Sequence, residues 1–309
     1  MKRRELNYRS VHELNQSVIR WSRDLPQNVE LIVGIPRSGL LAASLLSLHM
    51  HRPLCDLTTY LSGAEPWGGF RRATGAASGI TLLVDDTSHT GQEMDRVKAA
   101  VRAAGKDSAS VLYGAVYITA SARPFVDTFA EVLPHPRAFE WNILNHPRML
   151  SRACMDIDGV LCPDPADRDN DDGPRYRRFL SDTELRYRPS FKVHSLVTSR
   201  LEKYRPETEE WLARHGVEYG ELIMLDLPTA AERRRLGAHA THKAAAYAAS
   251  GNELFIESER DQGKRIHELT GLPVYVTDTR DFFGAGGDPN FREPWQHRAA
   301  DAARRILRR

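Results

Sequence analysis

The feature of this sequence that most constrains its fold is the alternation of short apolar runs with amphipathic segments. In the first half of the chain, apolar runs of strand length alternate with stretches whose apolar residues recur every three or four positions, as on one face of a helix. Strands that alternate with helices form parallel sheets. The expected helices are Val11–Trp21, Ser38–Met50 and Gly91–Ala104, and the expected strands are Glu30–Gly34, Ile80–Val84 and Ala109–Ile118.

A second series of the same kind begins near residue 149, after a passage punctuated by Pro134, Pro136 and Pro147. A chain of 309 residues is long for a single core. We therefore expect an α/β protein with two Rossmann-like, three-layer domains and mostly parallel sheets, spanning residues 1–148 and 149–309. In the second domain the expected strands are Lys192–Thr198, Glu221–Leu225, Glu253–Ile256 and Pro273–Val276, and the expected helix is Pro206–His215.

Charge and hydropathy exclude several classes of protein. Lys and Arg number 43 against 41 Asp and Glu, a net charge of +2, so the charge does not imply a nucleic-acid partner. The longest apolar stretch, Leu40–Met50, falls short of the roughly 18 residues that a membrane span needs. No apolar run follows the basic start, and Cys55, Cys154 and Cys162 lack metal-ligand spacing. We expect a cytoplasmic protein with reduced cysteines and a basic helix over 293–309, and leave a homodimer open.

The string LLVDDTSHTGQEM predicts a site for an anion and a sugar. Its apolar strand ends in Asp85 and Asp86, and a loop of small residues then opens a helix at Gly91. Backbone N–H groups at a helix start, together with the hydroxyls of Ser88 and Thr90, can wrap a phosphate. The paired carboxylates can accept hydrogen bonds from vicinal ribose hydroxyls. On this segment alone, acids that only cap the helix remain the alternative.

That string resembles the phosphoribosyl pyrophosphate (PRPP) motif of type I phosphoribosyltransferases, with four apolar residues, two acids, a short loop and Thr-Gly. Upstream, GIPRSG resembles the pyrophosphate loop of the same family, with Arg37, Ser38 and Gly39 at a helix start. Between the two motifs, LSGAEPWGGFRRATGAAS is similar to the family's mobile hood and carries Arg71 and Arg72, although a plain surface loop is the alternative. The resemblance covers roughly residues 28–120 and implies PRPP and Mg²⁺ as ligands.

His89 stands where the purine enzymes of that family carry an acid that handles the proton of the acceptor. An imidazole suits an acceptor that attacks through a hydroxyl, because its pKa is near neutral. A solvated loop histidine is the alternative. Trp141 can either stack on a ring or belong to the core at a sheet edge.

The string MDIDGVLC predicts a carboxylate nucleophile. Asp156 and Asp158 are two residues apart at the end of an apolar strand, hence on one face, and Gly159 opens the turn. One carboxylate can attack while the other shuttles a proton. The string resembles the DxDGxL/V signature of the haloacid dehalogenase (HAD) superfamily, which implies an aspartyl-phosphate intermediate on Asp156 and proton transfer by Asp158.

Three further segments extend this resemblance in the right order. Thr198 at the end of LVTS matches the hydroxyl of the second HAD motif, and Lys243 matches the lysine of the third. The resemblance implies that both neutralise the transferring phosphoryl oxygens. FIESERD offers Glu257, Glu259 and Asp261 for the acid of the fourth motif, which is usually an Asp pair, so the choice among them stays open.

The resemblance also implies Mg²⁺ bound by Asp156, the backbone carbonyl of Asp158 and Glu257. Lys203 and Lys264 are rivals for the lysine of the third motif.

Only about thirty residues separate the first two HAD motifs, which is too few for a large cap domain. A small cap leaves the site open and suits phosphates carried on large substrates. Arg175, Arg177 and Arg178 in this segment either assist binding or are solvated.

The pairing of the two domains resembles the two-module ribofuranosyltransferases of bacterial capsule and O-antigen assembly. It implies transfer of ribose 5-phosphate from PRPP to a hydroxyl of a glycan or glycolipid, with inversion, followed by removal of the 5-phosphate. One alternative is a nucleobase phosphoribosyltransferase fused to a nucleotidase, although no base-recognition segment is evident after residue 120. The other is a regulatory nucleic-acid binder on a phosphoribosyltransferase fold, which only the Arg-rich C-terminus supports.

Overall fold

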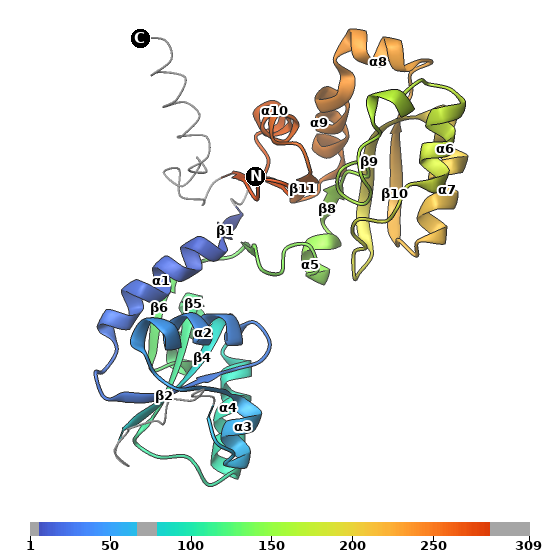
Figure 1. The fold of residues 1–309 in the computed structure, drawn as a ribbon. Helices are drawn as coiled ribbons and strands as arrows, with labels where there is room; N and C mark the ends of the chain where they lie inside the picture. The colour runs from blue at the N-terminus through green and yellow to red at the C-terminus, as the bar shows by residue number, and fades with distance from the viewer. Residues whose placement is uncertain (1–5, 67–78, 285–309) are drawn as a thin grey trace, which may run out of the picture. The chain divides into compact units, whose positions relative to one another are not determined.

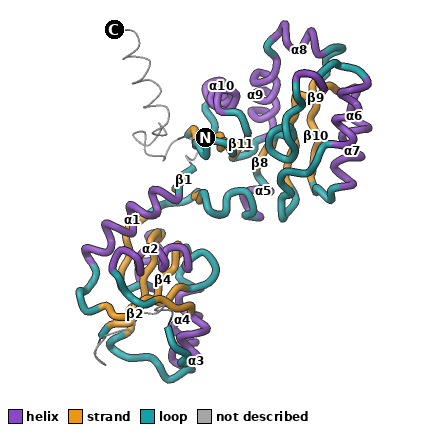
Figure 2. The backbone as a smooth tube through the Cα atoms, in the orientation of Figure 1, coloured by secondary structure: helices purple, strands orange, loops and turns teal. Residues whose placement is uncertain are grey.

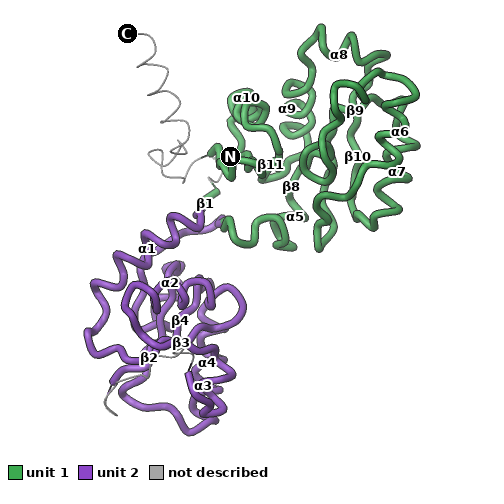
Figure 3. Tube along the Cα trace, in the orientation of Figure 1, with its two compact units in different colours: residues 1–8, 138–309 green, residues 9–137 purple. Residues whose placement is uncertain are grey.

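The structure, a computed structural model, describes residues 6–66 and 79–284, and the chain divides into two compact units (Figure 3). The N-terminal unit comprises residues 9–137, and the C-terminal unit comprises residues 138–309 together with 1–8. Each unit contains a mostly parallel sheet, so the predicted α/β class is confirmed (Figure 1). Arg71, Arg72 and the basic helix expected over 293–309 lie outside the described residues.

The N-terminal unit has a five-stranded parallel sheet in the order β3-β2-β4-β5-β6. The chain leaves β2 toward one edge of the sheet and builds the rest of the sheet on the other side from β4 onward. This reversal between β2 and β4 is a switch point, and ligands of open α/β sheets bind outside the carboxyl ends of the strands at such a point. The strands are β2 (Val29–Gly34), β3 (Leu54–Asp56), β4 (Ile80–Ser88), β5 (Val111–Ile118) and β6 (Thr128–Val132).

Helices cover both faces of this sheet. The helix α1 begins at a capping box, in which Ser10 and Glu13 each bond the other's backbone N–H. On one face, Trp21 of α1 packs on Gly114 and donates from Nε1 to Thr128 Oγ1 over 2.8 Å. On the other face, Val97 of α4 is buried among the apolar residues of β2 and β4. The helices are α1 (Val11–Asp24), α2 (Gly39–Met50), α3 (Leu57–Ser62), α4 (Gln92–Ala103) and the 3₁₀ helix η1 (Ala120–Phe125).

The C-terminal unit has a six-stranded sheet in the order β10-β9-β8-β11-β12-β13, parallel except for β13. The chain passes from β8 to β9 and β10 on one side and adds β11 on the other, so the switch point lies between β8 and β11. The strands are β8 (Ala153–Met155), β9 (Val193–Leu201), β10 (Tyr219–Leu225), β11 (Leu254–Glu257), β12 (Val274–Val276) and β13 (Phe282–Phe283).

Successive side chains of the central strands lie on opposite faces of the sheet and are buried against different helices. Met155 packs in one core with Trp211 of α7, whereas its neighbour Cys154 packs in another with Tyr247 of α9. Figure 2 shows α6 and α7 on one side of β9 and β10 and α9 on the other. The helices are α5 (Pro147–Leu150), α6 (Pro174–Asp182), α7 (Arg205–Arg214), α8 (Ala230–Leu236), α9 (Ala238–Ser250) and α10 (Arg260–Thr270), with the 3₁₀ helices η2 (Asp167–Asp169) and η3 (Glu202–Tyr204).

The division between the units falls earlier in the chain than residue 148, where the sequence analysis placed it. The strands β1 (Asn7–Arg9) and β7 (Arg137–Phe139) pair in a separate two-stranded sheet at the division. Ile143 is fully buried in the core of the C-terminal unit, and the Tyr8 ring stacks on Phe282 with 4.3 Å between centroids. Residues 138–148 therefore pack with the C-terminal unit.

Two expectations about chemistry and location can also be compared with the structure. The three cysteines are free and buried thiols. Within the described residues, no helix is long and apolar enough to cross a membrane.

Candidate active sites

The first candidate site lies at the carboxyl ends of β2 and β4, where the two loops singled out in the sequence meet. Gly39 opens α2 directly after the loop that follows β2. A Cβ atom on Gly39 would lie 2.8 Å from the carbonyl oxygen of Val84 and 3.0 Å from Asp85 Oδ1. Only glycine permits this approach, so the conformation of one loop depends on the other. Ser38 is half-buried beside it, and Arg37 is exposed.

The paired acids lie within β4, because that strand continues to Ser88 and does not end at the acids as the sequence indicated. Asp86 is only 5% exposed, and its backbone N–H donates to Asp85 Oδ1 over 2.8 Å. Burial, and then the charge of Asp86, raise the pKa of Asp85 well above its usual value. Burial lowers the pKa of Arg137 to about 10 against the opposing effect of Asp86. Arg137 is thus a neighbouring cation that no sequence motif predicted.

The loop after β4 is held chiefly through its backbone. Gly91 has φ +82°, and a Cβ atom there would lie 2.1 Å from the Phe125 ring. The carbonyl oxygen of His89 accepts hydrogen bonds from the hydroxyls of Thr119 and Ser121. Ser88 is buried and Thr90 is exposed, so these two predicted phosphate-binding hydroxyls differ in access to solvent.

The exposed His89 side chain is paired with a second histidine. His89 Nδ1 lies 2.8 Å from His135 Nε2, and the two rings meet edge to face with 4.0 Å between centroids. If His89 Nδ1 carries the shared proton, its Nε2 is the atom that can take a proton from an acceptor. Trp141, the predicted stacking residue, belongs to the other unit and stacks on Phe139.

The second candidate site lies at the carboxyl ends of β8, β9 and β11, on either side of the second switch point. Asp156 directly follows β8, Thr198 lies in β9 and Glu257 ends β11. Lys243 from α9 is buried among them, with Nζ 2.5 Å from Asp156 Oδ2 and 2.8 Å from Glu257 Oε2. It also donates to Gln262 Oε1 over 3.1 Å. Of the predicted residues, the structure therefore brings these two carboxylates together around one ammonium group.

The rival lysines lie elsewhere. Lys203 pairs with Asp172 at 2.9 Å, and Lys264 lies 3.9 Å from Glu268 on the surface of α10. Lys243 is therefore the lysine of the site.

Of the three candidate acids after β11, only Glu257 reaches Lys243. Glu259 instead caps α10, where its carboxylate accepts from the backbone N–H groups of Asp261 and Gln262. The Asp261 side chain is exposed.

Burial raises the pKa of Asp156 to about 8, and the charge of Glu257 adds to this effect, while the ammonium of Lys243 opposes it. One cation is thus shared between two buried acids.

Asp158 has a different partner. Arg200 is completely buried and places Nη2 2.7 Å from Asp158 Oδ1, while its Nε lies 3.2 Å from Oδ2. Burial opposes the charge on Asp158, but Arg200 outweighs it and lowers the pKa of the carboxyl. Arg200 was not singled out in the sequence. Its position two residues after Thr198, on the same face of the strand, is the one local signal that could have indicated it.

The oxygen atoms at this site are of the kind that Mg²⁺ prefers. The carboxylates of Asp156 and Glu257 share Lys243, whereas that of Asp158 is occupied by Arg200, which leaves its backbone carbonyl in the predicted role. Over residues 6–66 and 79–284 there is no group of three or more His, Cys, Asp or Glu side chains arranged to hold a metal ion. The side chains thus fit the metal in kind but supply only two ligands.

A cavity of about 180 Å³ opens onto this site. Burial lowers the pKa of His239 in its wall to about 4, so that imidazole is neutral at pH 7. Of the three arginines considered for this region, Arg175 pairs with Asp171 and Arg177 with Glu207, while Arg178 is exposed. Besides Asp156, Asp158 and Lys243, the lining residues are Asp164, Pro165, Asn170, Tyr176, Ser199, Arg233, His239 and Gln262.

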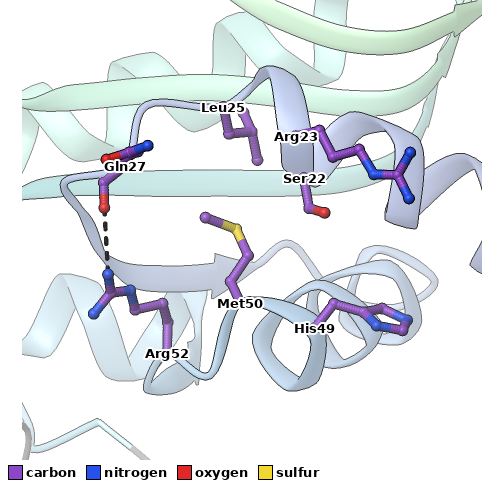
Figure 4. Close-up of a pocket in the computed structure, with 7 residues that line it drawn as sticks. All are labelled: Ser22, Arg23, Leu25, Gln27, His49, Met50 and Arg52. Atoms are coloured by element: carbon purple, nitrogen blue, oxygen red, sulfur yellow. Dashed lines mark hydrogen bonds between the residues drawn. The ribbon is translucent and has the colours of Figure 1, made fainter.

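A larger hollow of about 610 Å³ lies in the N-terminal unit, near the C-terminal ends of α1 and α2 (Figure 4). Its polar side chains bond to protein groups, with His49 Nε2 2.8 Å from Asn15 Oδ1 and Arg52 donating to the Gln27 carbonyl over 3.3 Å. It shares no residue with the loops after β2 and β4.

No family model matches the chain, and no curated protein matches it. Among solved structures, the chain is similar to a purine phosphoribosyltransferase from Pyrococcus horikoshii, with 19% identity over 44% of this chain and 92% of that one and a TM-score of 0.34. It is also similar to the xanthine-guanine-hypoxanthine phosphoribosyltransferase of Helicobacter pylori, with 17% identity over 44% and 93% of the two chains and a TM-score of 0.34. Both similarities cover less than half of this chain.

Proposed function

We propose that the chain is a bifunctional enzyme that transfers ribose 5-phosphate from PRPP to a glycan hydroxyl and then removes the 5-phosphate, in bacterial polysaccharide assembly. The observation that carries this proposal is the presence of two separately built sites, one at the switch point of each unit's sheet. The first combines a glycine turn with paired acids, and the second surrounds a carboxylate nucleophile with buried charge partners.

In the transfer step, the N–H groups of the loop at Gly39, with Arg37 and Ser38, would bind the pyrophosphate. Asp85 and Asp86 would accept hydrogen bonds from the ribose hydroxyls, which would offset the burial and the repulsion from Asp86 that raise the pKa of Asp85. The 5-phosphate would lie on the loop from Ser88 to Gly91.

The acceptor oxygen attacks C1 of the ribose while the bond from C1 to pyrophosphate breaks, with inversion. His89 takes the proton of the acceptor at Nε2, since its Nδ1 faces His135. An imidazole base at this position supports a hydroxyl acceptor, which must lose a proton as it attacks, over one that is already nucleophilic.

In the dephosphorylation step, Asp156 attacks phosphorus while the bond from phosphorus to the sugar oxygen breaks, and the leaving oxygen takes a proton from solvent. Water then attacks the phosphorus of the aspartyl phosphate, which releases inorganic phosphate and restores Asp156. Asp158, held ionised by Arg200, is suited to take the proton of that water. When bound by Asp156, Glu257 and the Asp158 carbonyl, Mg²⁺ supplies neutralisation of charge between nucleophile and phosphate.

The experiment that tests the proposal is incubation with PRPP, Mg²⁺ and either sugar or nucleobase acceptors, with product masses followed over time. We expect a ribosyl 5-phosphate product on a sugar acceptor, which is then converted to the phosphate-free ribosyl product. Consumption of nucleobases with no reaction of sugars would refute the glycan acceptor.

A further inference from the structure

We propose that Arg233 of α8 is the residue that binds the substrate phosphate in the second site, an inference that rests on the proposed phosphatase function. The substrate class that follows is a terminal phosphomonoester carried on a larger molecule. Neither the HAD resemblance nor any local motif in the sequence indicated this residue.

The other cations of the site are already neutralised by protein carboxylates. Lys243 is shared between Asp156 and Glu257, and Arg200 is paired with Asp158. A phosphate monoester carries a charge of about −1.5 to −2 at neutral pH. Such a group would therefore enter a site in which the acids outnumber the cations paired with them. Its binding needs a cation that is not paired with a protein carboxylate.

Arg233 meets this requirement. It is only 6% exposed, and it donates to uncharged acceptors, the carbonyl oxygen of Ser199 at 2.8 Å and Asn170 Oδ1 at 3.5 Å. Within the described part of the chain, its Nε has no hydrogen-bond partner and no carboxylate lies within ion-pairing distance. A guanidinium buried without an anion is costly, and an anionic ligand would offset that cost.

The volume of the cavity limits the size of the group that can bind inside it. At about 180 Å³ it is smaller than the roughly 300–1,000 Å³ of pockets that enclose a whole small molecule. Arg233 and the nucleophile Asp156 both line it, so one phosphoryl group can contact both. Ser199 Oγ, also buried and without a partner among the described residues, is a second donor in the same wall. The phosphoryl group fits inside while the rest of the molecule stays outside.

The test uses the full chain and compares Arg233→Gln with Arg234→Gln, a matched change on the exposed side of the same helix. Binding of inorganic phosphate is measured by calorimetry, and hydrolysis of ribose 5-phosphate by phosphate release. A charge-assisted hydrogen bond is worth about 1.5–3 kcal/mol, so we expect Arg233→Gln to weaken phosphate binding and raise KM by about 10- to 100-fold. Arg234→Gln should stay within about twofold of the parent.

Equal phosphate affinity in the two variants, with an active parent, would overturn the role of Arg233 and leave the phosphatase function standing. A parent protein that neither binds phosphate nor hydrolyses any phosphomonoester would refute both. Since Arg233 also donates to the backbone of β9, Arg233→Lys serves if the glutamine variant does not fold. A lysine lacks the planar set of donors that a guanidinium offers to phosphate, so phosphate affinity should fall about tenfold, and an unchanged affinity would overturn the proposal.

Discussion

The two candidate sites differ in how protein cations balance their carboxylates. In the N-terminal unit, half-buried Asp85 is adjacent to buried Asp86, and burial together with repulsion from Asp86 raises the pKa of Asp85. In the C-terminal unit, each buried carboxylate contacts a buried cation, but only Asp158 has one to itself, Arg200, while Asp156 and Glu257 share Lys243. A site built to hold sugar hydroxyls can keep carboxylates that ligand donors will satisfy. In the proposed phosphatase site, by contrast, protein cations contact the carboxylates before substrate arrives, and Asp156, which shares Lys243 with Glu257, keeps a pKa raised to about 8.

The largest effect should come from removing the nucleophile. Asp156→Asn should lower dephosphorylation by on the order of 10⁴-fold or more and leave transfer intact, because the other site lies in a separate unit. Mass spectrometry of the product should then show that it keeps the phosphate. A phosphate-free product at the parent's rate would mean that Asp156 is not the nucleophile.

The corresponding change in the first site tests whether its paired acids bind the ribose. Asp85→Asn combined with Asp86→Asn should slow transfer by about 10²- to 10⁴-fold, since two hydrogen bonds to charged acceptors are lost. Phosphatase activity on an acceptor that is already phosphoribosylated should survive and serves as the control for folding. Transfer at the parent's rate would mean that neither acid contributes to binding the ribose.

An effect on the transfer rate alone is expected for a change in the loop between the acids and α4. His89→Ala should lower the transfer rate by about 10²- to 10⁴-fold with little change in PRPP affinity, and His89→Asp should recover part of it. His49→Ala is the matched control, because that histidine bonds Asn15 away from the site. A His89→Ala rate within about threefold of the parent would mean that no base at this position is needed.

The smallest effect is one of stability. Asp85→Asn should stabilise the N-terminal unit by ~1 kcal/mol near pH 8, because it removes a carboxyl whose ionisation folding disfavours and keeps the acceptor for the Asp86 N–H. Since folding raises the pKa of Asp85, its favourable contribution is complete below the unfolded pKa of about 3.9 and is lost as pH rises through the folded pKa. The gain should therefore shrink as the pH is lowered.

Denaturant unfolding at pH 5 and pH 8 measures this gain. Asp158→Asn, the matched change in the other site, should destabilise its unit, since Arg200 would lose its counterion. The comparison would fail if both substitutions moved stability in the same direction.

Much of the fold could be predicted because its signals are local. The apolar runs that became β2, β5 and β9 are strong, and the residues at their carboxyl ends are adjacent in sequence to the strands that position them. The extension of β4 through the polar residues to Ser88 could not be predicted in this way. Thr87 and Ser88 are held in the strand by pairing with Tyr117 and Ile118 of β5, a contact between distant segments.

The parts of the sites that escaped prediction also depend on contacts between distant residues. Arg233 and His135 reach their sites from a helix and a loop that carry no motif, and Arg137 is near enough to Asp86 for that carboxylate to oppose the effect of burial on its pKa. Local sequence indicates which residue types are present at a strand end. It does not indicate which distant cation will face them.

The stacking of Tyr8 on Phe282 has a consequence for biosynthesis and for the design of expression plasmids. The C-terminal unit is discontinuous in sequence, because residues 9–137 are inserted between its first strand and the rest of it. During synthesis, Phe282 is added 274 residues after its partner Tyr8. At roughly 5–20 residues per second, this delay is about 14–55 s. A fragment that begins at residue 138 would lack Leu6 and Tyr8 and expose the face of Phe282, whereas a circular permutant that appends residues 6–8 through a linker would restore it.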